Sequence, residues 1–361
     1  MIELAAHIKA IVAEEGPISV ERYIEIALTH PQHGYYMNRD PFGAAGDFTT
    51  APEISQMFGE LVGLWSAEVW NAMGKPDPVR LIELGPGRGT LMSDALRAAR
   101  IVPEFRAAID VTLVEVSQTL AEIQHETLLT AGAPIAWAAS PSEAPEGPAI
   151  IIANEFLDAL PVRQYVRSHN RWRERVVWVD KSGQLGFAPG RQPEPFIQAP
   201  GEEGDILEVN PSAHRLVYEL AGRVARQGGI ALFVDYGHGV TSIGDTLQAV
   251  RGHRIVNPLA EPGECDITAH VDFAAMARSA RAAGAAVYGP IDQGDFLQEI
   301  GIDTRTRALG ERTPDRAQEF EEARKRLVGK DIGEMGALFK AMVVANRSLP
   351  VPPGFDAGVG R

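Results

Sequence analysis

Residues 81–90 carry the pattern with the most specific chemistry in this sequence. An apolar run, Leu-Ile-Glu-Leu, is followed by Gly85, Gly87 and Gly89, with Thr90 directly after them. The apolar run predicts a buried strand and the residues from Thr90 onward predict a helix. Glycines permit a sharp turn and let a ligand approach the backbone beside a helix N-terminus. We therefore expect a small-molecule site at the carboxyl end of this strand.

The spacing of these glycines argues against a dinucleotide as the ligand. A dinucleotide fingerprint, G-x-G-x-x-G, would require glycine where this chain has Thr90, and Pro86 has no N–H to offer a pyrophosphate. Glu83 precedes the turn and suits a ligand that carries an ammonium group. The pattern E-x-G-x-G-x-G resembles the first motif of Rossmann-like methyltransferases, which bind S-adenosylmethionine.

Polar residues also occur at the ends of two later predicted strands of this region. Glu115 ends the strand at residues 111–116, where a carboxylate can accept hydrogen bonds from both ribose hydroxyls of a nucleoside. Residues 150–152 are three isoleucines of a buried strand, after which Asn154 and Glu155 emerge. Carboxyl ends of parallel strands meet at one edge of a sheet, so Asn154 and Glu155 are expected beside the glycine turn.

Glu155 and Asp158 are the candidate catalytic residues. Methyl transfer is an in-line displacement that depends on alignment, and carboxylates can hold a planar guanidinium bidentately with its nitrogen in line. Glu155 is the first candidate for this role and Asp158 the second. The alternatives are that Glu155 is a solvated acid at a strand end and that Asp158 caps a helix.

A further polar cluster occurs between residues 263 and 272. We expect Asp266 and His270 to contact the substrate, although Asp266 or Thr268 could instead cap a helix. A divalent metal is conceivable with these residues and Asp272, but nothing else in the chain supplies a matching ligand pair, and no metal is predicted. Asp235 ends another buried strand and points to the same edge of the sheet.

Apolar strands alternate with helical patterns through most of the chain, which predicts an α/β fold with a parallel sheet covered on both faces. Residues 4–12 and those after Ser19 predict two N-terminal helices, and a long irregular loop runs from residue 30 to 51. Thr50 and Glu53 form a capping-box pattern with Pro52 at the start of one apolar helix. Aromatic and polar residues after 162 predict an antiparallel insertion. The expected segments are an N-terminal helical cap with a covering loop (1–76), the core (77–161 and 206–290), the inserted β element (162–205) and a C-terminal helical extension with the last sheet strand and an irregular tail (291–361).

Composition narrows the classes of function. The chain has 361 residues, with 34 Lys and Arg against 48 Asp and Glu, a formal net charge of −14. This balance argues against binding to nucleic acid and is compatible with small ligands or a basic peptide. No run approaches the roughly 20 apolar residues of a membrane span, so no membrane insertion is expected. The single Cys265 indicates a reducing compartment, and the acidic start Met1-Ile2-Glu3-Leu4 does not resemble a targeting peptide, so a cytoplasmic location is expected.

Four blocks in this order resemble the MidA-like methyltransferase family over residues 10 to 345. They are residues 46–55, 83–90, 154–161 and 265–273. The resemblance implies a seven-stranded Rossmann-like methyltransferase sheet and S-adenosyl-L-methionine as cofactor. It also implies that Phe48, Thr49 and Thr50 close over a cofactor held on Gly85, Gly87 and Gly89.

The same resemblance implies symmetric dimethylation of an arginine. In the mitochondrial members the acceptor lies on the 49-kDa subunit of respiratory complex I, and for a bacterial homologue that acceptor is an extrapolation. Two alternatives remain at this point: a non-catalytic factor that binds a client protein during complex I assembly, and a small-molecule methyltransferase. The acceptor residue, the number of methyl groups and the oligomeric state do not follow from the sequence.

Overall fold

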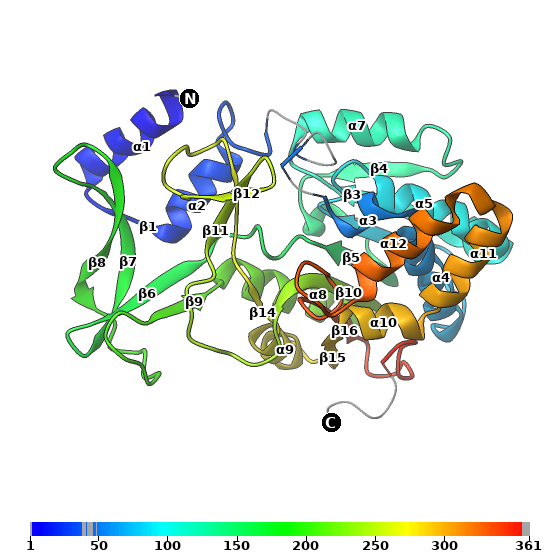
Figure 1. The fold of residues 1–361 in the computed structure, drawn as a ribbon. Coiled ribbons are helices and arrows are strands. Elements are labelled where there is room, and N and C mark those ends of the chain that lie inside the picture. Colours follow the sequence, from blue (N-terminus) through cyan, green and yellow to red (C-terminus); the bar gives the residue numbers. More distant parts are fainter. Residues whose placement is uncertain (1, 38–40, 42–45, 48, 356–361) are drawn as a thin grey trace. The chain divides into compact units, whose positions relative to one another are not determined.

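A computed structural model describes residues 2–37, 41, 46–47 and 49–355 (Figure 1). The chain forms two compact units, each assembled from separate sequence segments. Unit 1 comprises Met1–Phe48, Asp158–Arg215 and Thr241–His270, and unit 2 comprises Thr49–Leu157, Leu216–Val240 and Val271–Arg361.

Unit 2 contains a largely parallel sheet in the order β15-β16-β10-β5-β2-β3-β4. The five strands from β10 to β4 are parallel, β16 is antiparallel to β10, and β15 is antiparallel to β16. The short β14 pairs with the end of β10 as an eighth strand. The strands are β2 (Val79–Leu84), β3 (Ile109–Val114), β4 (Ile135–Ala138), β5 (Ala149–Asn154), β10 (Gly229–His238), β14 (Val271–Asp272), β15 (Ala286–Asp292) and β16 (Phe339–Ala345).

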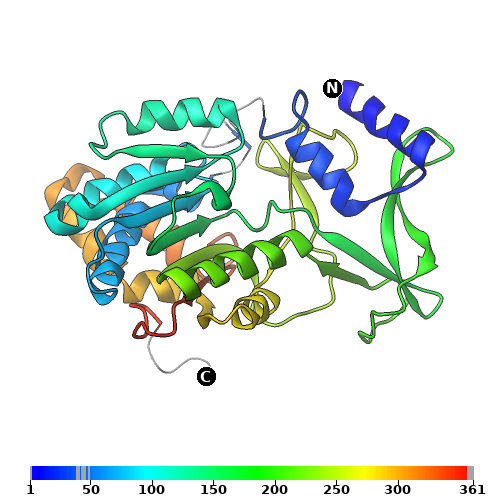
Figure 2. The same ribbon diagram turned by 180° about the vertical axis from the view of Figure 1, so that it is seen from behind.

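Helices lie on both faces of this sheet. Figure 1 shows α12 in front of the sheet. Figure 2, in which the molecule is seen from behind, shows α8 in front of the opposite face. The helices of unit 2 are α3 (Ala51–Ile54), α4 (Gln56–Ala72), α5 (Thr90–Ala98), α6 (Pro103–Ala108), α7 (Gln118–Leu128), α9 (Phe273–Ala282), α10 (Gln293–Glu299), α11 (Ile302–Arg312) and α12 (Ala317–Val328), with 3₁₀ turns η1 (Ala99–Ile101), η2 (Pro141–Glu143) and η3 (Pro314–Arg316). The boundary between the units falls inside α8 (Pro211–Gln227). The sheet is therefore covered by helices on both sides, as the alternating sequence pattern predicts.

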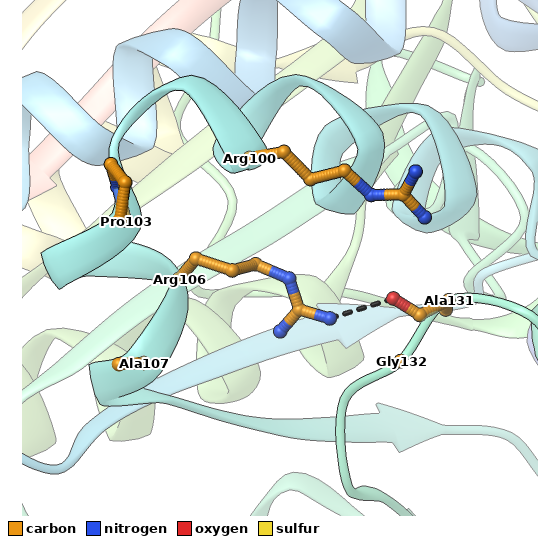
Figure 3. Close-up of a pocket in the computed structure, with 6 residues that line it drawn as sticks. All are labelled: Arg100, Pro103, Arg106, Ala107, Ala131 and Gly132. Carbon is orange, nitrogen blue, oxygen red and sulfur yellow. Dashed lines mark hydrogen bonds between the residues drawn. The ribbon is translucent and has the colours of Figure 1, made fainter.

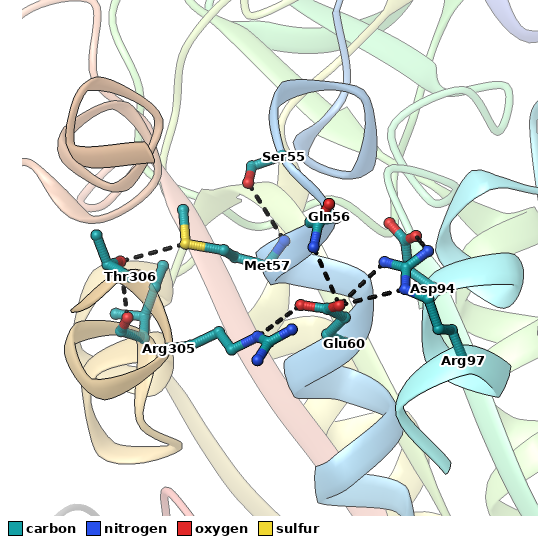
Figure 4. Close-up of polar contacts among 9 residues, drawn as sticks. Ser55, Gln56, Met57, Glu60, Asp94, Arg97, Arg305 and Thr306 are labelled. Atoms are coloured by element: carbon teal, nitrogen blue, oxygen red, sulfur yellow. Dashed lines mark hydrogen bonds and ion pairs between the residues drawn. The ribbon is translucent and has the colours of Figure 1, made fainter. Parts of the chain in front are cut away.

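Helix α4 is held against α5 and α11 by close packing and by one buried carboxylate. A Cβ atom on Gly59 would lie 2.7 Å from Asp94 Cβ, so glycine is needed where α4 and α5 cross. The buried Glu60 accepts hydrogen bonds from Arg97 of α5 at 3.0 Å and from Arg305 of α11 at 2.7 Å (Figure 4). Arg97 also pairs with Asp94 at 2.6 Å, and burial raises the pKa of Asp94 to about 6 despite that pair. These hydrogen bonds and ion pairs hold α4, which follows Thr50 and α3, against α5 and α11.

Unit 1 combines two antiparallel sheets with two N-terminal helices. One sheet has the order β1-β7-β6-β9 with β8 on β7, and the other has the order β12-β11-β13. A shared apolar core joins them to both helices and includes Ile8, Tyr23, Val177 and Ile267. The elements are α1 (Ile2–Glu15), β1 (Ile18–Ser19), α2 (Val20–Thr29), β6 (Arg163–Ser168), β7 (Arg171–Val179), β8 (Leu185–Pro193), β9 (Ile206–Val209), β11 (Gln248–Arg251), β12 (Arg254–Val256) and β13 (Asp266–Thr268). The antiparallel insertion predicted after residue 162 is present.

Two local expectations differ from the structure. The expected capping box is not formed, because Thr50 makes no side-chain cap bond and Glu53 instead accepts from Thr90 Oγ1 at 2.5 Å. The single expected helix is broken at Ser55, whose backbone is extended and whose hydroxyl accepts from Met57 N at the start of α4. A side-chain contact outside the segment therefore overrides the local pattern.

The segments expected from the sequence are also grouped differently. Residues 241–270, expected in the second part of the core, belong to unit 1, and α4, expected in the N-terminal cap, belongs to unit 2. Residues 241–270 belong to unit 1 because β11 and β13 pair with each other and not with the strands of the large sheet. Among the described residues, no helix is long and apolar enough to cross a membrane.

Candidate functional site

The glycine turn joins β2 to α5 and has an unusual backbone. Gly85, Gly87 and Gly89 have φ angles of +59°, +55° and +81°, in the left-handed region that other residues rarely adopt. A Cβ on Gly85 would lie 2.5 Å from the ring of Phe156. Gly89 N donates to Pro86 O at 2.8 Å, and Gly89 is the N-cap of α5. The turn thus places left-handed backbone and a helix N-terminus at the carboxyl edge of the sheet.

Glu83 and Asn154 lie on the same face of the sheet near this turn. Glu83 is level with Ile152 across β2 and β5, and Asn154 is two residues beyond Ile152, so the alternation of strands puts both on one face. Glu83 Oε2 and Asn154 Oδ1 are buried without a hydrogen-bond partner among the residues that the structure describes. Buried polar atoms are nearly always paired, so these two atoms point to a ligand.

Burial dominates the electrostatics of Glu83. The side chain is almost fully buried, and desolvation raises its pKa from 4.5 to about 8. The carboxyl therefore holds a proton at neutral pH until a cationic group approaches. An ammonium beside it would favour the ionised form.

Glu115 follows β3, and its carboxylate is held by hydrogen bonds. Its Oε1 accepts from Ser117 N at 2.8 Å and its Oε2 from Gln124 Nε2 at 3.0 Å. Burial raises the pKa of Glu115, and the hydrogen bonds from Ser117, Gln124 and the backbone of Val116 act in the opposite direction. A carboxylate has about four lone-pair sites, so Glu115 can still accept from a ligand hydroxyl.

Glu155 directly follows β5 and has a φ of +48°, which is rare for a residue with a side chain. Its Oε1 accepts from Ala51 N at 2.8 Å and from Asn154 Nδ2 at 3.2 Å. The carboxylate thus binds the first N–H of α3. The turn itself is held by the buried Asp235 of β10, whose Oδ2 accepts from Phe156 N at 3.1 Å and Leu157 N at 2.8 Å. A strained backbone position fixed by its neighbours is typical of functional sites.

The remaining candidates belong to unit 1. Asp158 lies in a turn and Asp266 in β13, and each is buried. Tyr36 Oη donates to Asp266 Oδ1 at 2.7 Å. Burial, with a further contribution from Asp158, raises the pKa of Asp266 to about 7. His270 is half-buried, and its backbone N–H donates to Thr246 Oγ1 at 2.9 Å.

The helix-cap alternatives for this segment are wrong. Asp158 precedes no helix, and Asp266 and Thr268 are strand residues. The cap of α9 is Asp272, which accepts from Ala275 N at 2.9 Å. Asp266 and Thr268 pair with β11 as part of β13, and α9 begins only at Phe273, so neither residue caps it.

The covering loop is described in part. Thr49 is half-buried and Thr50 is buried, whereas Phe48 lies outside the described residues. In unit 1, Asp47 accepts from Tyr35 Oη and from Gly252 N, both at 2.7 Å. These bonds tie the end of the long loop to the β11–β12 turn.

The sequence reading missed the residues that hold the candidates. Gln124 binds Glu115 and the glycine turn, and Tyr36 binds Asp266. For Gln124 a signal was available, because it lies on the buried stripe Leu120, Gln124, Leu128 of α7, where an apolar residue is usual. Tyr36 had no such signal in a loop without periodicity.

A shallow pocket lies away from these residues. It has a volume of about 410 Å³ and is lined by Arg100, Pro103, Arg106, Ala107, Ala131 and Gly132 (Figure 3). Helix α6 leads into β3, and Gly132 shortly precedes β4, so this pocket lies at the amino ends of the strands. It is therefore at the opposite edge from the glycine turn. No group of three or more His, Cys, Asp or Glu that could hold a metal occurs within the described part of the chain.

Comparisons with known proteins identify the family. Residues 61–291 match the family model described as "Putative S-adenosyl-L-methionine-dependent methyltransferase". This chain belongs to that methyltransferase family. It is 41% identical over 330 residues to mouse "Protein arginine methyltransferase NDUFAF7, mitochondrial", covering 84% of this chain and 75% of the relative, and 40% identical to the human protein of that name, covering 84% and 74%. A Burkholderia thailandensis protein with bound S-adenosyl-homocysteine has a crystal structure with TM-score 0.87 and 29% identity, covering 99% of this chain and 95% of the other.

The resemblance to the MidA-like family is thereby confirmed, as are the Rossmann-like fold and the cofactor S-adenosyl-L-methionine. The enzyme is a methyltransferase that depends on S-adenosyl-L-methionine, and its residues fit this cofactor. Glu83 Oε2 and Asn154 Oδ1, which have no hydrogen-bond partner among the described residues, offer acceptors for an ammonium, and the turn with Gly85 and Gly87 follows β2 with a left-handed backbone. When bound, the cofactor supplies an electrophilic methyl group. Alignment of the acceptor is then the task of the protein.

Proposed function

We propose that this methyltransferase transfers methyl groups to an arginine side chain of a protein, with symmetric dimethylation as the product. The observation that carries the proposal is the carboxylate of Glu155, fixed at the carboxyl end of β5 by Ala51 N at 2.8 Å and a left-handed backbone. A carboxylate held this firmly is suited to orient a guanidinium. The mouse and human relatives, named as protein arginine methyltransferases, support the same acceptor chemistry.

The proposal assigns a role to each candidate residue. Glu83 binds the amino-acid end of the cofactor and Glu115 its ribose, while Gly85, Gly87 and Gly89 admit it at the backbone and Asn154 contributes an amide. Phe48, Thr49 and Thr50 cover the cofactor. Glu155 and Asp158 are the catalytic candidates that orient the acceptor nitrogen, and Asp266 and His270 contact the substrate. In unit 1, the hydrogen bond from Tyr36 fixes the position of the Asp266 carboxyl.

For the acceptor protein we propose the 49-kDa-type subunit of respiratory complex I, which the family resemblance implies. The net charge of −14 favours an acceptor arginine within a basic segment over nucleic acid. We also propose the bacterial cytoplasm as the location, whereas the mouse relative is named as a mitochondrial protein. A single, buried Cys265 fits a compartment in which thiols stay reduced.

The experiment is methyl transfer from radiolabelled S-adenosylmethionine into a lysate of a bacterial strain that lacks this gene. The wild-type enzyme should label a protein band, and mass spectrometry should find dimethylarginine on a complex I subunit. The control is Gly87→Val, which places a branched side chain where φ is +55° and should abolish labelling.

The two alternatives give different results in this experiment. A small-molecule methyltransferase would put the label into the low-mass fraction. A non-catalytic assembly factor would give no label at all, while Gly87→Val would still support complex I assembly. Label on lysine or on a carboxyl group would overturn the proposed acceptor chemistry.

A further inference from the structure

The side chain of Gln124 makes a complete set of hydrogen bonds inside unit 2. It projects from α7, has no solvent-exposed surface, and donates from Nε2 to Gly87 O at 2.9 Å and to Glu115 Oε2 at 3.0 Å. Its Oε1 accepts from Trp137 Nε1 at 2.9 Å. A glutamine amide has two N–H donors, so both are used. Fully buried glutamine is uncommon and calls for a reason beyond packing.

The three partners of this amide come from three different elements. Gly87 lies in the turn after β2, Glu115 follows β3, and Trp137 belongs to β4. Helix α7 is also close to the turn itself, since a Cβ on Gly89 would lie 3.5 Å from Gln124 Cα. One side chain therefore couples the backbone of the glycine turn to the carboxylate of Glu115.

We propose that Gln124 is a positioning residue for the cofactor. It fixes the rotamer of Glu115, so that the remaining lone pairs of that carboxylate face a pair of ribose hydroxyls, and it holds the Gly87 carbonyl away from the ligand. It also stabilises the ionised form of Glu115, which burial disfavours. The proposal rests on the proposed placement of the ribose on Glu115.

The test measures the affinity of the purified enzyme for S-adenosyl-homocysteine by calorimetry between pH 5 and pH 9. Gln124→Leu keeps the approximate volume and removes both donors, so affinity at pH 7 should fall about tenfold or more, the loss of a charge-assisted hydrogen bond. Because the pKa of Glu115 then rises, the loss should grow as the pH falls. The matched control is Gln118→Leu on the same helix, where the amide pairs with Glu122 at the exposed surface. This control should bind as the wild type does.

A second variant separates positioning from simple packing and remains informative if Gln124→Leu does not fold. Gln124→Glu keeps the shape and an acceptor for Trp137, but its ionised form repels Glu115. Its affinity should therefore fall as the pH rises, the reverse of the trend for Gln124→Leu. Trp137→Phe removes only the donor to Oε1 and should keep the affinity within about threefold, because both bonds from Nε2 remain.

Two outcomes would overturn the inference, and they are distinguishable. If Glu115→Gln loses affinity but both Gln124 variants bind with the wild-type pH profile, Gln124 is structural and the ribose placement stands. If Glu115→Gln binds S-adenosyl-homocysteine as tightly as the wild type does, the placement of the ribose on Glu115 is wrong. The proposed role of Gln124 is then wrong as well.

Discussion

Under the proposed contact of Glu83 with the ammonium group of the cofactor, burial of this carboxyl would couple cofactor binding to release of a proton. With a pKa of about 8 in the folded protein against 4.5 ordinarily, Glu83 is protonated at pH 7. The folded state then binds more protons than the unfolded state, so the contribution of this group to stability decreases as pH rises from about 4.5 to about 8. An ammonium group placed beside the carboxyl reverses the preference and expels the proton.

We expect S-adenosyl-homocysteine to release close to one proton per molecule bound at pH 7. Calorimetry in two buffers of different ionisation enthalpy measures this number directly. Glu83→Gln should bind more weakly and without the release. Equal binding enthalpies in both buffers for the wild type would remove Glu83 from the amino-acid end of the cofactor.

The carboxylate of Glu155 offers a second prediction at the scale of one residue. Glu155→Gln keeps an oxygen that can accept from Ala51 N, so the turn and the cofactor affinity should be preserved within about threefold. Turnover should fall by one or more orders of magnitude, because a charge-assisted bond of about 1.5–3 kcal/mol to the acceptor is lost. Steady-state methylation and calorimetry on the same preparation measure both quantities.

The control for this variant is Glu143→Gln, since Glu143 also accepts a backbone N–H, from Ala139 at 2.9 Å, but is exposed. It should change turnover by less than twofold. A Glu155→Gln enzyme with unaltered methylation would leave Asp158 as the remaining catalytic candidate.

Elements that follow strong periodicity were predictable, and contacts between distant segments were not. The strand from Val79 to Leu84 and the helix starting at Thr90 agree with the sequence prediction, because an apolar run and a glycine turn define both ends. The bond from Ala51 N to Glu155 at the start of α3 was not predictable, because it joins residues 104 positions apart. The same limit applies to Gln124 and Glu115, whose link depends on how α7 packs.

The glycine turn gives a prediction for an element as a whole. Gly85→Ala adds a methyl group 2.5 Å from Phe156 at a φ of +59°, so the turn must move. Affinity for S-adenosyl-homocysteine should fall by more than tenfold, measured by calorimetry. Gly74→Ala imposes similar backbone strain at a φ of +84° with nothing within 4 Å. It should lower stability by about 1–2 kcal/mol in urea unfolding and leave binding unchanged.

At the scale of the whole molecule, the candidate residues divide between the two units. Glu83, Glu115, Asn154 and the three glycines belong to unit 2, whereas Asp158, Asp266 and His270 belong to unit 1. Each unit has its own apolar core, built from different segments of the chain. Glu155, the first candidate for orienting the acceptor, also belongs to unit 2, so the proposed cofactor residues and the first catalytic candidate share one unit.

This division predicts how binding of the cofactor product alone affects backbone exchange. A ligand at 100 times its Kd stabilises the native state by about 2.7 kcal/mol, and local openings that break the site are suppressed accordingly. With S-adenosyl-homocysteine, hydrogen exchange measured by mass spectrometry should slow at residues 83–90, 115–124 and 154–157 of unit 2. Strands β6 to β9 of unit 1 should exchange at the same rate with and without the ligand. The Gly87→Val enzyme should show no change anywhere, and protection confined to unit 1 would contradict the assignment of the cofactor to the glycine turn.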